Sequence, residues 1–104
     1  METLEFSFAS TPSERVHAPA LRGVVSSGNL EVLVTSAPSG GDCRVLVHTS
    51  ARGFRDIWHA VLETFAAEHP VGRLSVVIND MGATPAVVML RLSQALSAYN
   101  EAAR

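Results

Sequence analysis

Four segments of the chain alternate apolar and polar residues with a period of two. In the first, Leu4, Phe6 and Phe8 alternate with polar or charged residues. This is the pattern of a β-strand with one buried face, because successive side chains of a strand point to opposite sides. Three further runs of this kind lie at residues 30–35, 43–49 and 74–78. We therefore predict strands in all four segments.

A fifth apolar run, residues 21–25, is separated from the run at 30–35 by Ser26, Ser27, Gly28 and Asn29. Because Gly and Asn tolerate the positive φ angles that tight turns demand, we predict that the two runs form a hairpin. Ser27 should then lie at an exposed turn. A second turn is predicted at residues 37–41, where the sequence is APSGG.

Two segments follow the period of an α-helix. The apolar stripe of the first consists of Phe54, Ile57, Trp58, Val61, Leu62 and Phe65. The second helix should begin at Pro85, because Thr84 suits an N-cap and proline suits the first helical position. Its stripe consists of Val88, Leu92, Ala95, Leu96 and Tyr99. Both stripes need an apolar partner surface, and one face of a sheet can supply it.

The order of the elements predicts the architecture. The strand at 43–49, the first helix and the strand at 74–78 form a crossover unit, which should be right-handed if the two strands are parallel. The chain has 104 residues and is 47% hydrophobic, which suits one domain, residues 1–104, with one core. We predict an α/β (α+β) fold, a two-layer sandwich of a mostly antiparallel sheet with two helices on one face.

Composition limits the cellular compartments and the kinds of partner that we expect for this chain. The formal net charge is -2, and no basic stripe is present of the kind that binds a phosphate backbone, so nucleic acid is not an expected partner. No run approaches the ~18 apolar residues of a membrane span, and residues 1–8 lack the features of a signal peptide. The single Cys43 cannot form an internal disulfide, which fits a reducing compartment. We expect a cytoplasmic protein that does not bind membranes.

Few residues suggest catalysis. The four histidines have no i,i+4 pair and no cysteine companions, so we expect no metal site. No serine lies in a Gly-x-Ser-x-Gly elbow, so we expect no catalytic serine. Residues 39–42 contain two glycines, but no helix follows them to supply oriented N–H groups, and they are interpreted as a turn.

Two segments allow more than one interpretation. The sequence GATP at residues 82–85 precedes a helix whose first N–H groups could receive an anion, although an ordinary capped helix start explains the same residues. The serines at 26 and 27 fit a plain hairpin turn. Periodicity and composition do not distinguish a modified serine from an unmodified one.

Considered together, the segments VSSGNLEVL at residues 25–33 and NDMGATPAVV at residues 79–88 resemble the delta, or acyl-carrier, subunits of bacterial malonate decarboxylases. The resemblance spans nearly the whole chain, and the family is similar in length. The serine-glycine turn followed by Leu-Glu-Val-Leu is specific in combination with the downstream Gly-Ala-Thr-Pro.

The resemblance implies a prosthetic group. In the family, the serine before the glycine carries 2'-(5''-phosphoribosyl)-3'-dephospho-CoA through a phosphodiester bond, and this serine corresponds to Ser27. Ser26 stands where the family often has glycine, which makes it a rival attachment point. Asn29 replaces a common Asp and removes a carboxylate from the turn. Gly28 and Asn29 would form the turn that presents the serine.

The resemblance also implies a carrier without catalytic activity of its own. Loss of carbon dioxide from malonate leaves negative charge on carbon, which a thioester carbonyl can accept as an enolate, and the cofactor thiol supplies the sulfur. The implied partners are the acyltransferase and decarboxylase subunits of the complex and the holo-carrier synthase that attaches the group. From the N–H donors expected at the start of the second helix, we also hypothesise that Gly82 and Thr84 guide the cofactor phosphates or contact this synthase.

Two other functions remain open from the sequence. The chain could be an interaction or regulatory module with an unmodified serine turn. It could also be the related carrier subunit of citrate lyase, which uses the same prosthetic group, although the Gly-Ala-Thr-Pro segment favours the malonate system.

Overall fold

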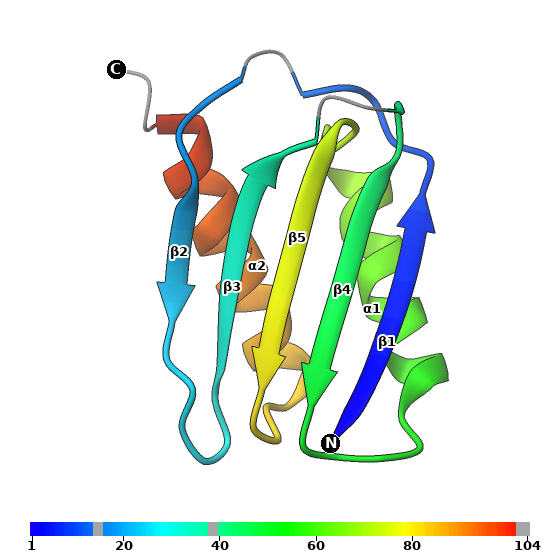
Figure 1. The fold of residues 1–104 in the computed structure, drawn as a ribbon, viewed down its shortest axis with the longest axis vertical. Helices are drawn as coiled ribbons and strands as arrows, with labels where there is room; N and C mark the ends of the chain where they lie inside the picture. Colours follow the sequence, from blue (N-terminus) through cyan, green and yellow to red (C-terminus); the bar gives the residue numbers. More distant parts are fainter. Residues whose placement is uncertain (14–15, 38–39, 102–104) are drawn as a thin grey trace.

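The chain folds into one sheet and two helices over the residues that the structure describes, 1–13, 16–37 and 40–101. The structure is a computed structural model, and Figure 1 shows its ribbon. In chain order the elements are β1 (Glu2–Phe8), β2 (Ala20–Gly23), β3 (Leu30–Ser36), β4 (Cys43–Thr49), α1 (Arg55–Glu68), β5 (Leu74–Asp80) and α2 (Pro85–Glu101). These elements confirm the predicted α+β class.

The strands of the sheet lie in the order β1-β4-β5-β3-β2 (Figure 1). The pairs β1 with β4, β3 with β5 and β2 with β3 are antiparallel, whereas β4 and β5 are parallel. In the parallel pair, Val45 lies beside Val76 and Val47 lies beside Ile78. Since α1 connects β4 to β5, these elements form the predicted crossover unit, and the sheet is mostly antiparallel as expected.

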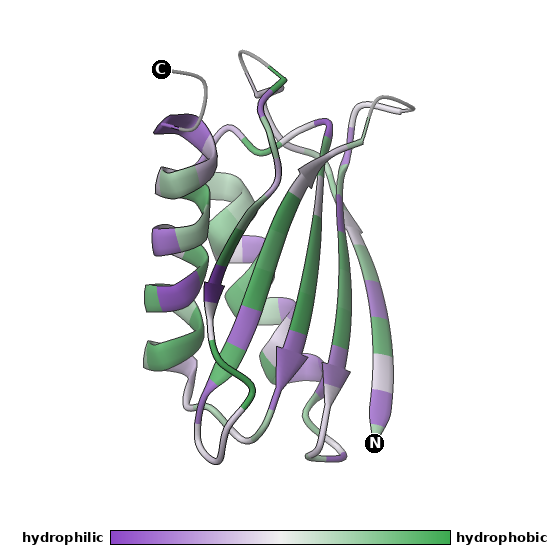
Figure 2. Ribbon diagram, turned by 60° about the vertical axis from the view of Figure 1, so that its left-hand side comes forward, coloured by the Kyte–Doolittle hydropathy of each residue, from purple (hydrophilic) through white to green (hydrophobic). Residues whose placement is uncertain are grey.

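Both helices cover the same face of the sheet, as Figure 2 shows. The predicted stripe of α2 is buried against this face in full. Apolar residues at alternate positions of four strands are also buried on this face of the sheet. The buried residues are the even-numbered apolar residues of β1, β3 and β5 and the odd-numbered ones of β4. Burial of these apolar side chains therefore holds the two layers together.

The stripe of α1 is only partly covered. Trp58, Leu62 and Phe65 are buried, but Phe54 and Ile57 are 46% and 48% exposed. The expectation that the whole stripe packs on the sheet is therefore wrong for its first turn. The packing here is incomplete, and Phe54 and Ile57 line a cavity that is also lined by residues at the start of α2.

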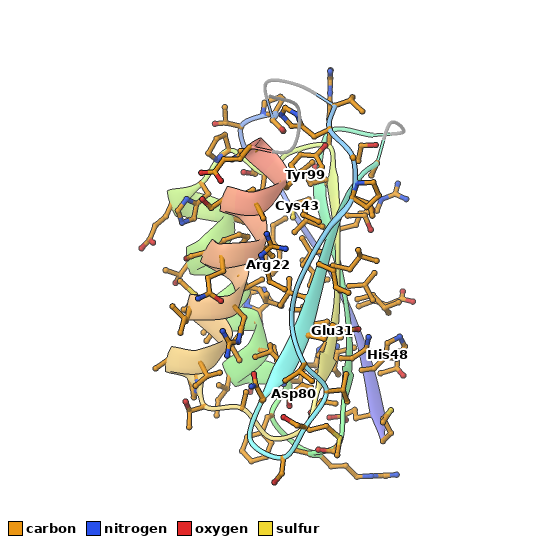
Figure 3. The ribbon with its side chains drawn as sticks, turned by 90° about the vertical axis from the view of Figure 1, so that its left-hand side faces the viewer. Arg22, Glu31, Cys43, His48, Asp80 and Tyr99 are labelled. Atoms are coloured by element: carbon orange, nitrogen blue, oxygen red, sulfur yellow. The ribbon has the colours of Figure 1, made fainter. Side chains whose placement is uncertain are left out.

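The opposite face of the sheet has no helix packed on it among the described residues (Figure 2). Figure 3 places Glu31 and His48 on this side of the sheet. Asn79 Nδ2 donates to Glu31 Oε1 over 3.1 Å, and Thr3 Oγ1 lies 3.3 Å from His48 Nδ1. Polar side chains thus pair across neighbouring strands on the face that remains in contact with solvent.

The hairpin differs in detail from its prediction. β2 ends at Gly23, so Val24 and Val25, which were predicted to continue the strand, lie in the loop and are about half exposed. Gly23 has a φ of 92°, and the Val24 N–H donates to the Leu30 carbonyl over 3.1 Å. Because this positive φ turns the chain out of the strand, the loop runs from residue 24 to 29 instead of 26 to 29.

Two remaining expectations concern a turn and the membrane. The predicted turn at residues 37–41 and the glycine segment at 39–42 include Pro38 or Ser39, which lie outside the described residues. Within the described parts of the chain, neither helix is long and apolar enough to cross a bilayer.

Gly23→Ala should lower the free energy of unfolding by at least about 2 kcal/mol. An added Cβ would lie 2.1 Å from the Leu30 carbonyl oxygen, and the positive φ disfavours alanine. Urea unfolding followed by circular dichroism measures the change.

The control is Gly41→Ala, because its added Cβ would lie more than 4 Å from every described residue other than its chain neighbours. This variant should change the free energy of unfolding by about 0.5 kcal/mol or less. Equal losses in the two variants would contradict the close approach of Gly23 to β3.

Candidate functional site

The loop between β2 and β3 presents Ser27 to solvent. Ser26 and Ser27 are both exposed, and the Asn29 N–H donates to the Ser26 carbonyl over 2.9 Å, which closes a turn around Ser27. Gly28 has a φ of 73°, a value that glycine adopts without strain. Neither serine hydroxyl makes a hydrogen bond to another described residue. The predicted exposed position of Ser27 is therefore confirmed, and its hydroxyl is accessible to a reagent or enzyme.

Two backbone hydrogen bonds join this loop to the segment between β5 and α2. The Gly28 N–H donates to the Met81 carbonyl over 2.8 Å, and the Met81 N–H donates to the Asn29 carbonyl over 3.0 Å. Both loops lie at the same end of the molecule (Figure 1). The structure thus brings together the two sequence segments on which the family resemblance was based, although residues 34–78 separate them in the chain.

The carboxyl group of Asp80 organises this end of the sheet. Asp80 is only 4% exposed, and it accepts hydrogen bonds from Thr49 Oγ1 at 2.9 Å, the Gly82 N–H at 3.1 Å and the Ala83 N–H at 3.0 Å. Figure 3 places it at the end that carries the β2–β3 loop. The side chain connects the ends of β4 and β5 to the start of α2.

These hydrogen bonds change the interpretation of the GATP segment. The N–H group of Gly82, which the sequence suggested as a free anion donor, already donates to Asp80, as does that of Ala83. Thr84 acts as the predicted N-cap, since its Oγ1 accepts from the Val87 N–H at 3.4 Å and its carbonyl accepts from the Val88 N–H at 2.9 Å. The premise of free amide donors at Gly82 is therefore wrong, because a side chain from β5 satisfies them.

α2 places a cation beside the serine loop. Arg91 Nε donates to Asn29 Oδ1 over 3.3 Å, and Arg91 Nη1 donates to Gln94 Oε1 over 2.8 Å. Asn29 Oδ1 also accepts from the Leu30 N–H at 2.8 Å. Asn29 thus connects the loop to α2 without a carboxylate. Sequence patterns did not single out Arg91, although it is the only basic residue of this helix.

A mostly apolar cavity of about 320 Å³ lies at the same end of the molecule. It opens between the first turns of α1 and α2, beside the loop that follows β5. Its lining residues are Ala51, Phe54, Ile57, Trp58, Val61, Asp80, Gly82, Ala83, Pro85 and Val88. The sequence contained one indication of this cavity. The predicted apolar stripe of α1 includes Phe54 and Ile57, which line the cavity and are not buried against the sheet.

Neither Cys43 nor a histidine is among the residues described above for the serine loop and the cavity. Cys43 is buried in β4, and burial, with a smaller contribution from the neighbouring Asp42, raises the pKa of its thiol to about 11. This thiol stays protonated at neutral pH and is a poor nucleophile. Among the described residues, no three His, Cys, Asp or Glu side chains gather in a way that could hold a metal ion.

Comparison with known proteins identifies the family. The family described as malonate decarboxylase delta subunit (MdcD) matches residues 17–99. The chain belongs to this family. The matched residues include the serine loop, Asp80 and Arg91, and therefore the whole candidate site. The resemblance that the two short segments indicated is confirmed.

Individual relatives support the same assignment. The chain is 57% identical over 95 residues to the malonate decarboxylase acyl carrier protein of Burkholderia cepacia, with 91% of this chain and 87% of that one covered. It is 52% identical over 99 residues to the protein of the same name from Acinetobacter calcoaceticus, with 95% and 97% covered. Close relatives of this chain are therefore named as acyl carriers.

A solved structure shows the same fold. One chain in a crystal structure of a Pseudomonas malonate decarboxylase hetero-tetramer in complex with malonate superposes with a TM-score of 0.79 and 38% sequence identity. The superposition covers 93% of this chain and 97% of that one. The fold of this chain is therefore shared with one chain of a malonate decarboxylase hetero-tetramer.

Asp80→Ala should lower the free energy of unfolding by about 3 kcal/mol or more. The substitution removes an acceptor from one hydroxyl and two backbone N–H groups that are packed away from most water. Chemical denaturation measures the loss. Glu63→Ala removes the same charge from the exposed side of α1 and should change stability by about 0.5 kcal/mol or less. A loss below 1 kcal/mol for Asp80→Ala would refute the organising role.

Proposed function

We propose that this protein is the acyl-carrier subunit of a malonate decarboxylase and that it carries acetyl and malonyl groups as thioesters on a prosthetic group attached to Ser27. The proposed group is 2'-(5''-phosphoribosyl)-3'-dephospho-CoA. The observation that carries the proposal is the exposed Ser27 hydroxyl on a turn that is tied by hydrogen bonds to Met81. Membership of the delta-subunit family supports it.

The residues around Ser27 suit a phosphodiester at this position. The Ser27 side chain points into no packed region and can accept a bulky substituent, since the loop residues 24–28 are exposed. Arg91 donates to Asn29, which lies two residues after Ser27 in the chain. The Arg91 guanidinium has five N–H donors, and only two of them have hydrogen-bond partners among the described residues. A positive charge here would stabilise the anionic linkage.

The chain's own groups fit a carrier that performs no chemistry alone. When bound, the prosthetic group supplies a thiol whose acyl thioester can accept the charge that decarboxylation leaves on carbon. Cys43 is a poor substitute, because it is buried and its pKa is raised to about 11. The role of this chain is to hold the attachment point and to keep the acyl group at high effective concentration near its partners.

The end of the molecule that carries Ser27 suits contact with partner subunits. Val24 and Val25 lie in the serine loop and Met81 is hydrogen-bonded to it, and each of the three side chains is at least 37% exposed. Exposed apolar side chains gathered around a functional residue are typical of interaction surfaces. We propose that the acyltransferase subunit, the decarboxylase subunits and the holo-carrier synthase all approach this end, because each must reach Ser27 or the group attached to it.

Ser27→Ala should abolish attachment of the prosthetic group and malonate decarboxylation by the assembled complex. Without the hydroxyl no phosphodiester can form at this position. The free energy of unfolding should change by about 0.5 kcal/mol or less, because the exposed side chain neither caps a helix nor packs in the core. Intact mass of the carrier purified from its complex measures attachment, and malonate-dependent release of carbon dioxide measures activity.

Ser26→Ala is the matched control, since it removes the neighbouring hydroxyl from the same turn. This variant should keep the added mass and most of the activity. Loss of attachment in Ser26→Ala but not in Ser27→Ala would move the site by one residue. Unchanged attachment in both variants, or no added mass on the wild-type chain, would reject the proposed function.

Arg91→Gln should slow attachment of the group by the synthase roughly tenfold, the effect of losing one charge-assisted hydrogen bond. The rate of mass gain in a reaction with purified synthase measures this effect. Arg44→Gln, an exposed residue of β4, removes the same charge and should leave the rate unchanged. Equal rates for the two variants would exclude a role for Arg91 near the linkage.

A further inference from the structure

The cavity between α1 and α2 lies within reach of whatever is attached to Ser27. Ser27 precedes Gly28, the Gly28 N–H donates to the Met81 carbonyl over 2.8 Å, and the next residue, Gly82, lines the cavity. Following these bonds, the Cα atoms of Ser27 and Gly82 are at most about 10 Å apart. The proposed function does not by itself use this cavity.

We infer that the cavity binds the adenine ring of the prosthetic group, an inference that rests on the proposed attachment to Ser27. In this group the phosphoribosyl unit joins Ser27 to the 2' position of the adenosine, while the thiol lies at the far end of the pantetheine arm. Adenine is therefore the aromatic ring of the group, and only two ribose units and a phosphate lie between it and Ser27. The ring would lie between the first turns of α1 and α2.

The size and lining of the cavity suit one flat ring system. Its volume of about 320 Å³ is near the lower end of the roughly 300–1,000 Å³ range of small-molecule sites. It can hold a single base but not the whole prosthetic group. Phe54, Ile57 and Trp58 form one wall, and aromatic side chains are the usual surfaces on which nucleic acid bases stack.

Asp80 supplies a polar group that an adenine ring can use. It lines the cavity, and its two carboxyl oxygens accept three hydrogen bonds from Thr49, Gly82 and Ala83. Since a carboxylate has about four acceptor positions, one further donor can be accommodated. The exocyclic amino group of adenine is such a donor, so the ring would enter with its amino edge towards Asp80.

The residues that line the cavity disfavour binding of the acyl group at the end of the pantetheine arm. The N–H groups of Ala51, Gly82 and Ala83 in the cavity wall already donate to Thr49 or Asp80, and so they are not available to a thioester carbonyl. The carboxylate of a malonyl group and the phosphates of the cofactor would be repelled by the Asp80 carboxylate. Binding of the adenine would therefore leave the pantetheine arm outside, free to reach partner active sites.

Nuclear Overhauser contacts in the holo-protein test this inference. The adenine ring has two isolated protons, H2 and H8, and we expect contacts from them to the Trp58 ring and the Val88 methyl groups. Trp58 is the only tryptophan of the chain, so its ring signals are assigned without ambiguity. Contacts from the pantetheine methyl groups or the acetyl group in place of adenine, or no cofactor contacts with the cavity, would overturn the inference.

A pair of variants adds a second measurement. Ala51→Leu extends a side chain into the cavity, and we expect loss of the adenine contacts while intact mass still shows the cofactor on Ser27. Ala60→Leu makes the same change on an exposed position of α1 that does not line the cavity, and it should keep the contacts. Correct added mass without adenine contacts in the wild-type protein would reject the cavity inference alone. Absence of the added mass would reject the proposed function as well.

Discussion

The buried carboxyl group of Asp80 is the constraint on which the end of the molecule that carries Ser27 depends. A carboxylate placed at 4% exposure is costly unless its oxygens are satisfied, and here Thr49, Gly82 and Ala83 satisfy them. The same three hydrogen bonds determine the course of the chain from β5 to α2. Because Met81 lies within that segment and bonds to both Gly28 and Asn29, the position of the serine loop follows from the placement of one side chain.

The charges at this end of the molecule are separated in a way that suits the proposed cofactor. Arg91 reaches the serine loop through Asn29, whereas Asp80 faces the cavity between the helices. An anionic linkage would lie near the cation, and a neutral base with an amino group would lie near the carboxylate. The site does not need a carboxylate at residue 29. The amide oxygen of Asn29 already accepts hydrogen bonds from Arg91 Nε and from the Leu30 N–H.

The partial exposure of α1 would serve a function if the cavity binds the adenine ring as proposed. Complete packing of Phe54 and Ile57 against the sheet would increase apolar burial, but it would close the space between the two helices. Binding sites commonly retain such local departures from optimal packing. Elsewhere in the described core, the stripe of α2 and the alternating residues of the strands are buried in the predicted register.

The sequence alone determined the strands, both helices, the α+β class and the exposed position of Ser27, because these features depend on local periodicity and on turn residues. It also determined the family, through the two segments at residues 25–33 and 79–88. Tertiary structure alone decided that β2 ends at Gly23, that Asp80 occupies the amide donors before α2 and that Arg91 reaches Asn29. Each of these depends on contacts between distant segments, and no local pattern in a single sequence records which distant partner a backbone group or a charge will meet.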